Sequence, residues 1–354
     1  MQRPNTESSI LIIYTGGTIG MVENPATGVL EAFDFTYLNK NVPELNRFGC
    51  NISVEQFDPP IDSSAITPQE WIRIAEIIRD NYDSHDGFVV LHGTDTMSYT
   101  ACALSFLLNN LSKPVILTGS QLPIGKLRTD GKENLITAIE IAAAKINGKA
   151  RVPEVCIFFE NYLMRGNRTS KVSADQFNAF DSFNYPQLAY AGIDIKYNDG
   201  AIMQLPHDMP PFSISTNLNP NVGILKLYPG ITREVVESYL AIPGLKGIVL
   251  ETFGSGNAPM DEWFLEALEK AVKNGKVIVN VTQCVTGYVD MTRYETGHLL
   301  EKIGLVSGYD STSECALVKL MYLFGQNLSP EEVKCQMCLP LRGEISIEGV
   351  YCHH

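Results

Sequence analysis

Short apolar, β-branched runs alternate along the chain with longer segments in which apolar residues recur at helical spacing. The runs, which predict buried strands, are residues 10–14, 87–91, 114–118 and 154–159. The intervening segments, which predict helices, are residues 68–81, 98–110 and 130–145. Strands that are apolar throughout are typical of parallel sheets buried on both faces. The pattern therefore predicts an α/β fold whose parallel sheet is covered by helices on both sides.

A second set of strands and helices follows a stretch rich in Pro, Asn, Asp and Ser near residues 190–220. Its predicted strands are residues 222–227, 247–251 and 276–281, and its predicted helices are residues 233–240, 261–274, 297–304, 311–324 and 330–337. Two domains also suit the 354-residue length, because single cores rarely grow beyond ~250–300 residues. We expect a large N-terminal flavodoxin- or Rossmann-like catalytic domain (1–192), a linker (193–220) and a smaller C-terminal α/β domain (221–354).

The composition indicates a globular protein, since 45% of the residues are hydrophobic and 19% are charged. A formal net charge of −13 disfavours binding to nucleic acid or to an anionic membrane surface, because both need clustered Lys and Arg. The first apolar run, residues 10–14, is too short for a signal peptide or a membrane span. We therefore expect a cytoplasmic protein with neither nucleic-acid nor membrane partners.

The arrangement nearest to a metal motif combines Cys335 and Cys338 with Cys352 and the two histidines that follow it. Cys335 and Cys338 fall on a predicted helix, which disfavours a zinc motif. We therefore expect no metal site.

Two turns that combine glycine and threonine follow two of the predicted strands. Residues 15–20 read Thr-Gly-Gly-Thr-Ile-Gly, and residues 92–96 read His-Gly-Thr-Asp-Thr. Ligands of open α/β sheets bind beyond the carboxyl ends of the strands, so both turns are expected at a binding site. The glycines let backbone N–H groups approach a substrate closely and form an oxyanion hole. We expect His92 to stabilise the second turn by hydrogen bonding rather than to act as a base.

A threonine hydroxyl is a poor nucleophile unless a base or a charge relay activates it. Thr94, Asp95 and a lysine would form such a relay, and the best lysine is Lys171 in the polar run 165–171. Each residue alone has a structural alternative: Asp95 as a helix cap, Lys171 as a solvated surface residue, and the glycine turn as a plain connection. Their joint occurrence favours catalysis.

These turns resemble the two active-site signatures of the bacterial-type L-asparaginases. The resemblance covers nearly the whole chain, through residues 62–64, 117–121, 165–171, 228–230, 254–257 and 341–344. Tyr14 before the first signature, the Asp-Ser-Ser triplet and the missing signal peptide are similar to the cytoplasmic type I branch. The resemblance implies hydrolysis of L-asparagine to L-aspartate and ammonia without a cofactor.

The resemblance also implies roles for individual residues. Thr18 would be the nucleophile that forms a threonine acyl-enzyme, with Thr94, Asp95 and Lys171 as the second catalytic group. The residues implied to bind the substrate are Asp62, Ser63, Ser64, Thr94, Asp95 and Asn257. Asn257 is similar to a residue that a neighbouring subunit supplies, which implies a homodimer or a dimer of dimers.

Two departures from the family pattern affect these expectations. The loop at residues 21–35 has no tyrosine to assist the nucleophile, since Val29 stands near the expected place, so the group that activates Thr18 is left open. A regulatory second asparagine site is implied at Glu251, Thr252, Phe253, Thr282 and Cys284. However, Glu251 replaces a family arginine and would repel a carboxylate, which argues against regulation.

Two other functions fit the same signatures. One is the subunit of an archaeal-type glutamyl-tRNA amidotransferase that supplies ammonia, although the first strand begins by Ile10 and leaves little room for that subunit's added N-terminal domain. The other is a non-catalytic amino-acid-sensing module. The joint presence of Thr18, Thr94, Asp95 and Lys171 disfavours such a module.

Overall fold

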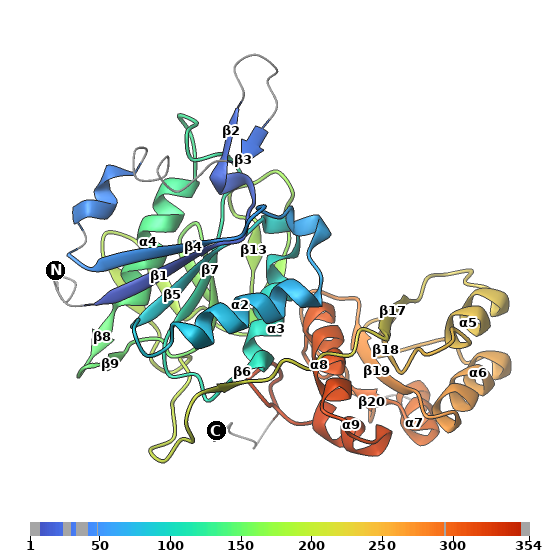
Figure 1. The fold of residues 1–354 in the computed structure, drawn as a ribbon. Helices are drawn as coiled ribbons and strands as arrows, with labels where there is room; N and C mark the ends of the chain where they lie inside the picture. The colour runs from blue at the N-terminus through green and yellow to red at the C-terminus, as the bar shows by residue number, and fades with distance from the viewer. Residues whose placement is uncertain (1–7, 24–29, 33–41, 48, 294, 348–354) are drawn as a thin grey trace. The chain divides into compact units, whose positions relative to one another are not determined.

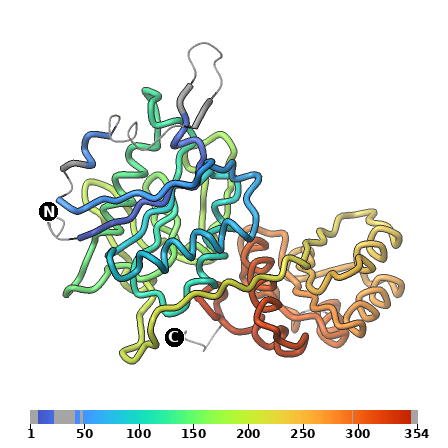
Figure 2. The backbone as a smooth tube through the Cα atoms, viewed as in Figure 1, coloured from blue at the N-terminus to red at the C-terminus, as the bar shows by residue number. Residues whose placement is uncertain are grey.

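The chain forms two compact units in the computed structural model, and along the sequence the division falls between Ser215 and Thr216 (Figures 1 and 2). The structure describes residues 8–23, 30–32, 42–47, 49–293 and 295–347. In the tube of Figure 2 the first unit runs from blue to yellow-green and the second from yellow to red. The predicted linker spans this junction, and its strands β15 (Ile195–Tyr197) and β16 (Ser213–Ile214) pair with strands of the first unit. We keep the division into 1–192, 193–220 and 221–354 as a proposal.

The first unit is built on an eight-stranded sheet. In spatial order its strands are β15, β14 (Ala189–Ala191), β11 (Tyr162–Arg165), β10 (Val155–Phe159), β7 (Val115–Thr118), β5 (Gly87–Leu91), β1 (Ser9–Tyr14) and β4 (Asn51–Gln56). The five strands from β10 to β4 are parallel, which confirms the predicted α/β fold. The other three are antiparallel, which the strand pattern did not predict. The reversal occurs because β11 follows β10 through a tight turn, with Glu160 at φ 55°, instead of a helical crossover.

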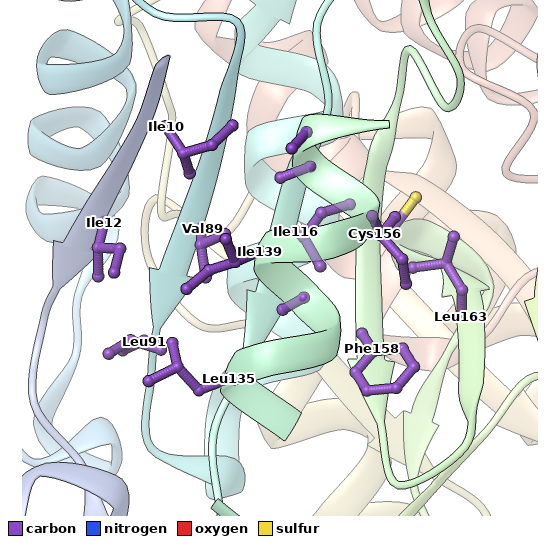
Figure 3. Packing of buried hydrophobic residues seen from close by; sticks show 14 of the residues in the cluster. Ile10, Ile12, Val89, Leu91, Ile116, Leu135, Ile139, Cys156, Phe158 and Leu163 are labelled. Atoms are coloured by element: carbon purple, nitrogen blue, oxygen red, sulfur yellow. The ribbon is translucent and has the colours of Figure 1, made fainter. Parts of the chain in front are cut away.

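Helices cover both faces of this sheet (Figure 1): α2 (Pro68–Asp80) and α3 (Met97–Leu107) on one, α4 (Gly131–Ala143) on the other. Figure 3 shows Leu135 and Ile139 of α4 packed over the strand residues Val89, Leu91 and Ile116. All five are at most 2% exposed. Burying each such aliphatic side chain contributes about 1.5–3 kcal/mol. The parallel strands are thereby held as a rigid platform.

Short elements complete the first unit. They are η1 (Thr18–Gly20), β2 (Met21–Glu23), β3 (Leu30–Ala32), η2 (Pro43–Arg47), η3 (Ser63–Ala65), η4 (Thr94–Thr96), β6 (Leu108–Asn109), β8 (Lys145–Ile146), β9 (Lys149–Ala150), η5 (Gly166–Arg168), β12 (Ser170–Lys171) and β13 (Phe180–Asp181). The turns η1, η3 and η4 follow β1, β4 and β5. Because these three strands are parallel neighbours, their turns meet at one edge of the sheet.

The second unit contains a smaller parallel sheet between two helical layers. Its strands are β17 (Val222–Lys226), β18 (Gly247–Thr252), β19 (Val277–Thr282) and β20 (Val306–Ser307). One face packs against α5 (Arg233–Leu240), α6 (Glu262–Lys273) and α7 (Glu295–Ile303), the other against α8 (Ser313–Gly325) and α9 (Pro330–Met337). The predicted second α/β set is thus confirmed. Among the described residues, every helix is too short or too polar to cross a lipid bilayer.

Candidate active site

The first threonine turn packs directly against the second. Gly16 and Gly17 have φ angles of 138° and 92°, which side chains disfavour. A Cβ atom at Gly17 would lie 2.5 Å from the Cα of Gly93, and one at Gly16 would collide with the Ile61 carbonyl. Both positions therefore require glycine, because any side chain would push neighbouring turns apart.

The Asp-Ser-Ser triplet adjoins the second turn. The Thr96 hydroxyl donates a hydrogen bond to the Ser63 carbonyl oxygen at 2.7 Å, and Ser63 is buried. Asp62 caps η3, since its Oδ1 accepts a hydrogen bond from the Ser64 N–H at 2.9 Å. Asp62 and Ser64 are exposed. The fold thus brings all three predicted substrate-binding residues beside Thr94 and Asp95.

Lys171 contacts both members of the predicted relay. Its Nζ donates to Thr94 Oγ1 at 2.9 Å and to Asp95 Oδ1 at 2.7 Å. The Lys171 side chain is 19% exposed, whereas the Asp95 side chain is 63% exposed. Asp95 can therefore pair with Lys171 and still present a carboxylate oxygen to a ligand.

Gln121, in the stretch 117–121, is a further polar neighbour of Thr94, and the sequence assigned it no individual role. Its Nε2 donates to the Gln176 carbonyl oxygen at 2.9 Å, and its Oε1 lies 3.4 Å from Thr94 Oγ1. A carbonyl oxygen only accepts, so the amide nitrogen faces Gln176 and Oε1 faces Thr94. Lys171 already donates to Thr94, and the hydroxyl proton of Thr94 is therefore directed toward Gln121. The available signal was the position of Gln121 just after the strand that ends at Thr118.

Thr18 is the first residue of η1 and is half-buried. Within the described residues, its hydroxyl and its N–H have no hydrogen-bond partner, and the same holds for the N–H of Thr94, the first residue of η4. The first N–H groups of a helical turn lack partners inside the turn. Two unpaired N–H donors from contacting turns are suited to bind a developing oxyanion.

Tyr14, which comes shortly before Thr18, is not suited to act as a general base. The Tyr14 hydroxyl donates to the Gly20 carbonyl oxygen at 3.0 Å, and burial raises its pKa to about 12. A phenol with that pKa stays protonated at neutral pH and is no general base. Val29, which stands near the place where the resemblance implies a tyrosine, lies outside the described residues.

His92 is buried directly before the second turn. Its Nδ1 lies 2.7 Å from the Gly93 carbonyl oxygen, and its Nε2 lies 2.9 Å from Thr100 Oγ1. Burial lowers the pKa of His92 from 6.5 to about 4, against a smaller opposing effect of the Gly93 hydrogen bond. His92 is therefore neutral near pH 7, and its contacts agree with the expected hydrogen-bonding role.

We predict an acid-labile contribution of His92 to stability. Between pH 6.5 and pH 4 the unfolded chain binds a proton at His92 that the folded chain does not, so the free energy of unfolding falls as the pH falls through this window. The full loss is about 3 kcal/mol. Urea denaturation at pH 7 and pH 4.5 should show a larger loss for the wild type than for His92→Asn. Equal losses would contradict the buried neutral state.

Asn257 lies in the second unit, in the turn after β18. Its backbone bridges that of Phe253, and its Oδ1 accepts a hydrogen bond from the Thr296 hydroxyl at 2.8 Å. This contact orients the side chain. Its predicted role in a neighbouring subunit's site stays a prediction.

The predicted regulatory residues surround the ends of β18 and β19. Glu251 accepts a hydrogen bond from the Ser313 hydroxyl at 2.6 Å. Thr252 is buried and hydrogen-bonded within the unit, and the Thr282 hydroxyl accepts the Cys284 N–H at 3.0 Å. The polar groups of Glu251, Thr252 and Thr282 are thus all hydrogen-bonded within the second unit. The regulatory site stays a prediction.

In the part of the chain that the structure describes, no group of three or more His, Cys, Asp and Glu side chains is placed to bind a metal ion. Cys335 and Cys338 lie at the end of α9, while Cys352 and the histidines after it fall outside the described residues.

Comparison with known proteins matches both units to one family. Residues 9–203 match the description "Asparaginase, N-terminal", and residues 221–337 match "Glutaminase/Asparaginase C-terminal domain". The chain is 43% identical to L-asparaginase 1 of Escherichia coli strain K12 over 345 residues, covering 96% of this chain and 98% of that protein.

Solved structures show the same likeness. The crystal structure of L-asparaginase I from Vibrio cholerae has a TM-score of 0.87 and 43% identity, over 96% of this chain and 100% of that one. The thermostable L-asparaginase of Thermococcus kodakarensis has a TM-score of 0.86 and 33% identity, over 96% and 100%. With both units matched and its threonine turns in contact at one sheet edge, this chain belongs to the asparaginase family.

Proposed function

We propose that this protein is an L-asparaginase, an amidohydrolase that converts L-asparagine and water to L-aspartate and ammonia. The observation that carries the proposal is the contact of Lys171 with both Thr94 and Asp95, beside the turn that holds Thr18. Relatives that match over nearly their whole length are named L-asparaginases. Nothing favours the amidotransferase subunit or the sensing module over this function.

In the first step, Thr18 Oγ1 attacks the side-chain amide carbon of the substrate. The N–H groups of Thr18 and Thr94 stabilise the oxyanion, and each such donor is often worth about 3 kcal/mol. Lys171 passes a proton through the Thr94 hydroxyl to the leaving nitrogen, which departs as ammonia. The proton of Thr18 passes to the group that activates it. An ester between Thr18 and the substrate's β-carbonyl remains.

In the second step, water attacks this ester, and the proton flow is reversed. Thr94 takes a proton from the water and returns one to Lys171, while Thr18 regains its own proton as the leaving group. The sum is one water consumed and one ammonia released. Gln121 supports this exchange because its Oε1 accepts a hydrogen bond from the Thr94 hydroxyl between steps.

Substrate selection follows from a clamp at the α-carbon. Asp62, Ser63 and Ser64 would bind the α-carboxylate end, and the exposed Asp95 carboxylate would bind the α-ammonium group. A fixed clamp sets how far the amide reaches, so the extra methylene of glutamine misplaces its carbonyl relative to Thr18. We further propose that the protein forms a homodimer or a dimer of dimers, in which Asn257 reaches the active site of the neighbouring subunit. We also propose that it acts in the cytoplasm.

Ammonia release tests this function directly. We expect wild-type protein to hydrolyse L-asparagine with a kcat/KM roughly 10- to 200-fold above that for L-glutamine. This is the usual range of discrimination between substrates that differ by one methylene group. Steady-state assays of both amides, with free ammonium measured enzymatically, check the ratio. An absence of ammonia from L-asparagine would refute the proposed function, and equal rates would refute the clamp.

A further inference from the structure

A chain of buried polar groups leads from α2 to the second threonine turn. Trp71 Nε1 donates to Thr100 Oγ1 at 3.0 Å, and Thr100 Oγ1 lies 2.9 Å from His92 Nε2. His92 Nδ1 lies 2.7 Å from the Gly93 carbonyl oxygen. Trp71 is 5% exposed, Thr100 0% and His92 1%. These groups come from α2, α3 and the end of β5.

The first donor and the last acceptor of this hydrogen-bonded series, the Trp71 indole and the Gly93 carbonyl, determine the direction of every hydrogen bond in it. An indole N–H can only donate, and a carbonyl oxygen can only accept. The nitrogen of His92 that faces Gly93 must therefore carry the proton, which leaves Nε2 as an acceptor in the neutral ring. Thr100 accepts from Trp71 and donates to this Nε2. The ring is thus confined to its Nδ1–H tautomer.

The last bond also sets the orientation of one peptide group. The carbonyl of Gly93 points at the buried ring of His92. In a trans peptide the N–H of the next residue points the opposite way, so the Thr94 N–H is directed away from that ring. This N–H is one of the two unpaired donors described above.

We propose that Trp71, Thr100 and His92 form a positioning relay that holds the Gly93–Thr94 peptide with the Thr94 N–H aimed at the reacting carbonyl. The inference rests on the proposed hydrolysis. His92 acts through the peptide and contacts no reacting atom. Its neutral state, favoured by the lowered pKa, suits the relay because an imidazolium would present a second donor to Thr100.

Packing alone does not explain these residues. Burial of an indole N–H, a hydroxyl and an imidazole is costly unless each polar group is hydrogen-bonded. Apolar side chains of similar volume would fill the same space without that requirement. A fully satisfied network, by contrast, specifies one arrangement of the backbone that it contacts.

The relay can be tested with two replacements that each retain one end of the imidazole. In His92→Asn the amide nitrogen reaches the place of Nδ1 and can still donate to Gly93. In His92→Gln the amide reaches the place of Nε2 and contacts Thr100 instead. We expect kcat for L-asparagine to fall roughly 3- to 10-fold further in His92→Gln than in His92→Asn, with KM nearly unchanged, because the oxyanion exists only in the transition state.

Equal kcat values for the two variants, or an effect on KM alone, would overturn the positioning relay of Trp71, Thr100 and His92. Thr100→Val and Thr100→Ser supply an independent pair if His92→Gln does not fold. Thr100→Val removes the hydroxyl donor to His92 at nearly constant volume and should lower kcat. Thr100→Ser keeps this hydroxyl and should keep kcat near the wild-type value. Matched thermal unfolding curves separate this effect from a loss of folded protein.

A spectroscopic readout separates failure of the relay from failure of the proposed function. Nitrogen-15 spectra of the histidine rings in the wild type, with His92→Asn for assignment, report the tautomer without any substrate. We expect the neutral Nδ1–H form at pH 7. The Nε2–H tautomer or an imidazolium would overturn the relay, even in an active enzyme. An inactive wild type with the expected tautomer would refute the hydrolysis alone.

Discussion

Thr18→Ala is expected to lower kcat for L-asparagine by roughly 10⁴- to 10⁶-fold, the usual cost of removing a nucleophile from a covalent mechanism. Without Oγ1 no ester forms, and only water bound near the two turns remains to attack the amide. The fold should survive, because the Thr18 hydroxyl makes no hydrogen bond among the described residues. Ammonia assays on matched amounts of folded protein provide the measurement.

Thr18→Ser is the matched control, since it retains a hydroxyl on the same turn. We expect it to keep a reduced but measurable activity and to form a covalent adduct with substrate that mass spectrometry detects. Thr18→Ala should form no adduct. Hydrolysis above one-tenth of the wild-type rate in Thr18→Ala would rule out Thr18 as the nucleophile and direct attention to Thr94 in the adjoining turn.

Lys171→Met is expected to lower kcat by about 10²- to 10⁴-fold, the range of general acid–base catalysis. Methionine has a similar length but neither donates to Thr94 nor exchanges protons with it. Asp95 would also lose its partner, so KM should change as well as kcat. Steady-state kinetics at saturating and limiting L-asparagine separate the two effects.

Two further lysine variants sharpen this test. Lys149→Met alters an exposed lysine of β9 and should leave hydrolysis unchanged. Lys171→Arg keeps the positive charge, but a guanidinium does not release a proton at neutral pH. Activity near wild type in Lys171→Arg would mean that Lys171 supplies charge rather than a proton. Wild-type rates in Lys171→Met would exclude Lys171 from the chemistry.

Local pattern predicted much of the fold. Buried strands such as β5 and β7 are visible as continuous apolar runs, and α9 spans the residues predicted for it, 330–337. The antiparallel strands β11, β14 and β15 were missed, since they are short and their pairing depends on tight turns rather than on periodicity. The edge strand β4 was missed because its side chains are largely solvent-accessible and carry no apolar run.

The candidate site was only partly visible in the sequence. Thr18 and Thr94 stand after predicted parallel strands, and that position alone places them at one sheet edge. Gln121 lies in the stretch 117–121 that carries the resemblance, but its contact with Thr94 spans 27 positions and is visible only in the structure. In the sequence, Trp71 and Thr100 are ordinary residues of helical segments. Their roles depend on hydrogen bonds between residues of different elements, Trp71 with Thr100 and Thr100 with His92.

The alternation of strands and helices, and the glycine turns that follow β1 and β5, can be predicted from the sequence because they depend on neighbouring residues. The contact of Lys171 with Thr94 and Asp95, which lie 77 and 76 positions away, depends on the folded structure. The tertiary structure also buries His92 and places it against Gly93 and Thr100, contacts that favour a neutral ring with the proton on Nδ1. The physical reason is that proton positions follow from donors and acceptors brought together across the fold, which local composition does not encode.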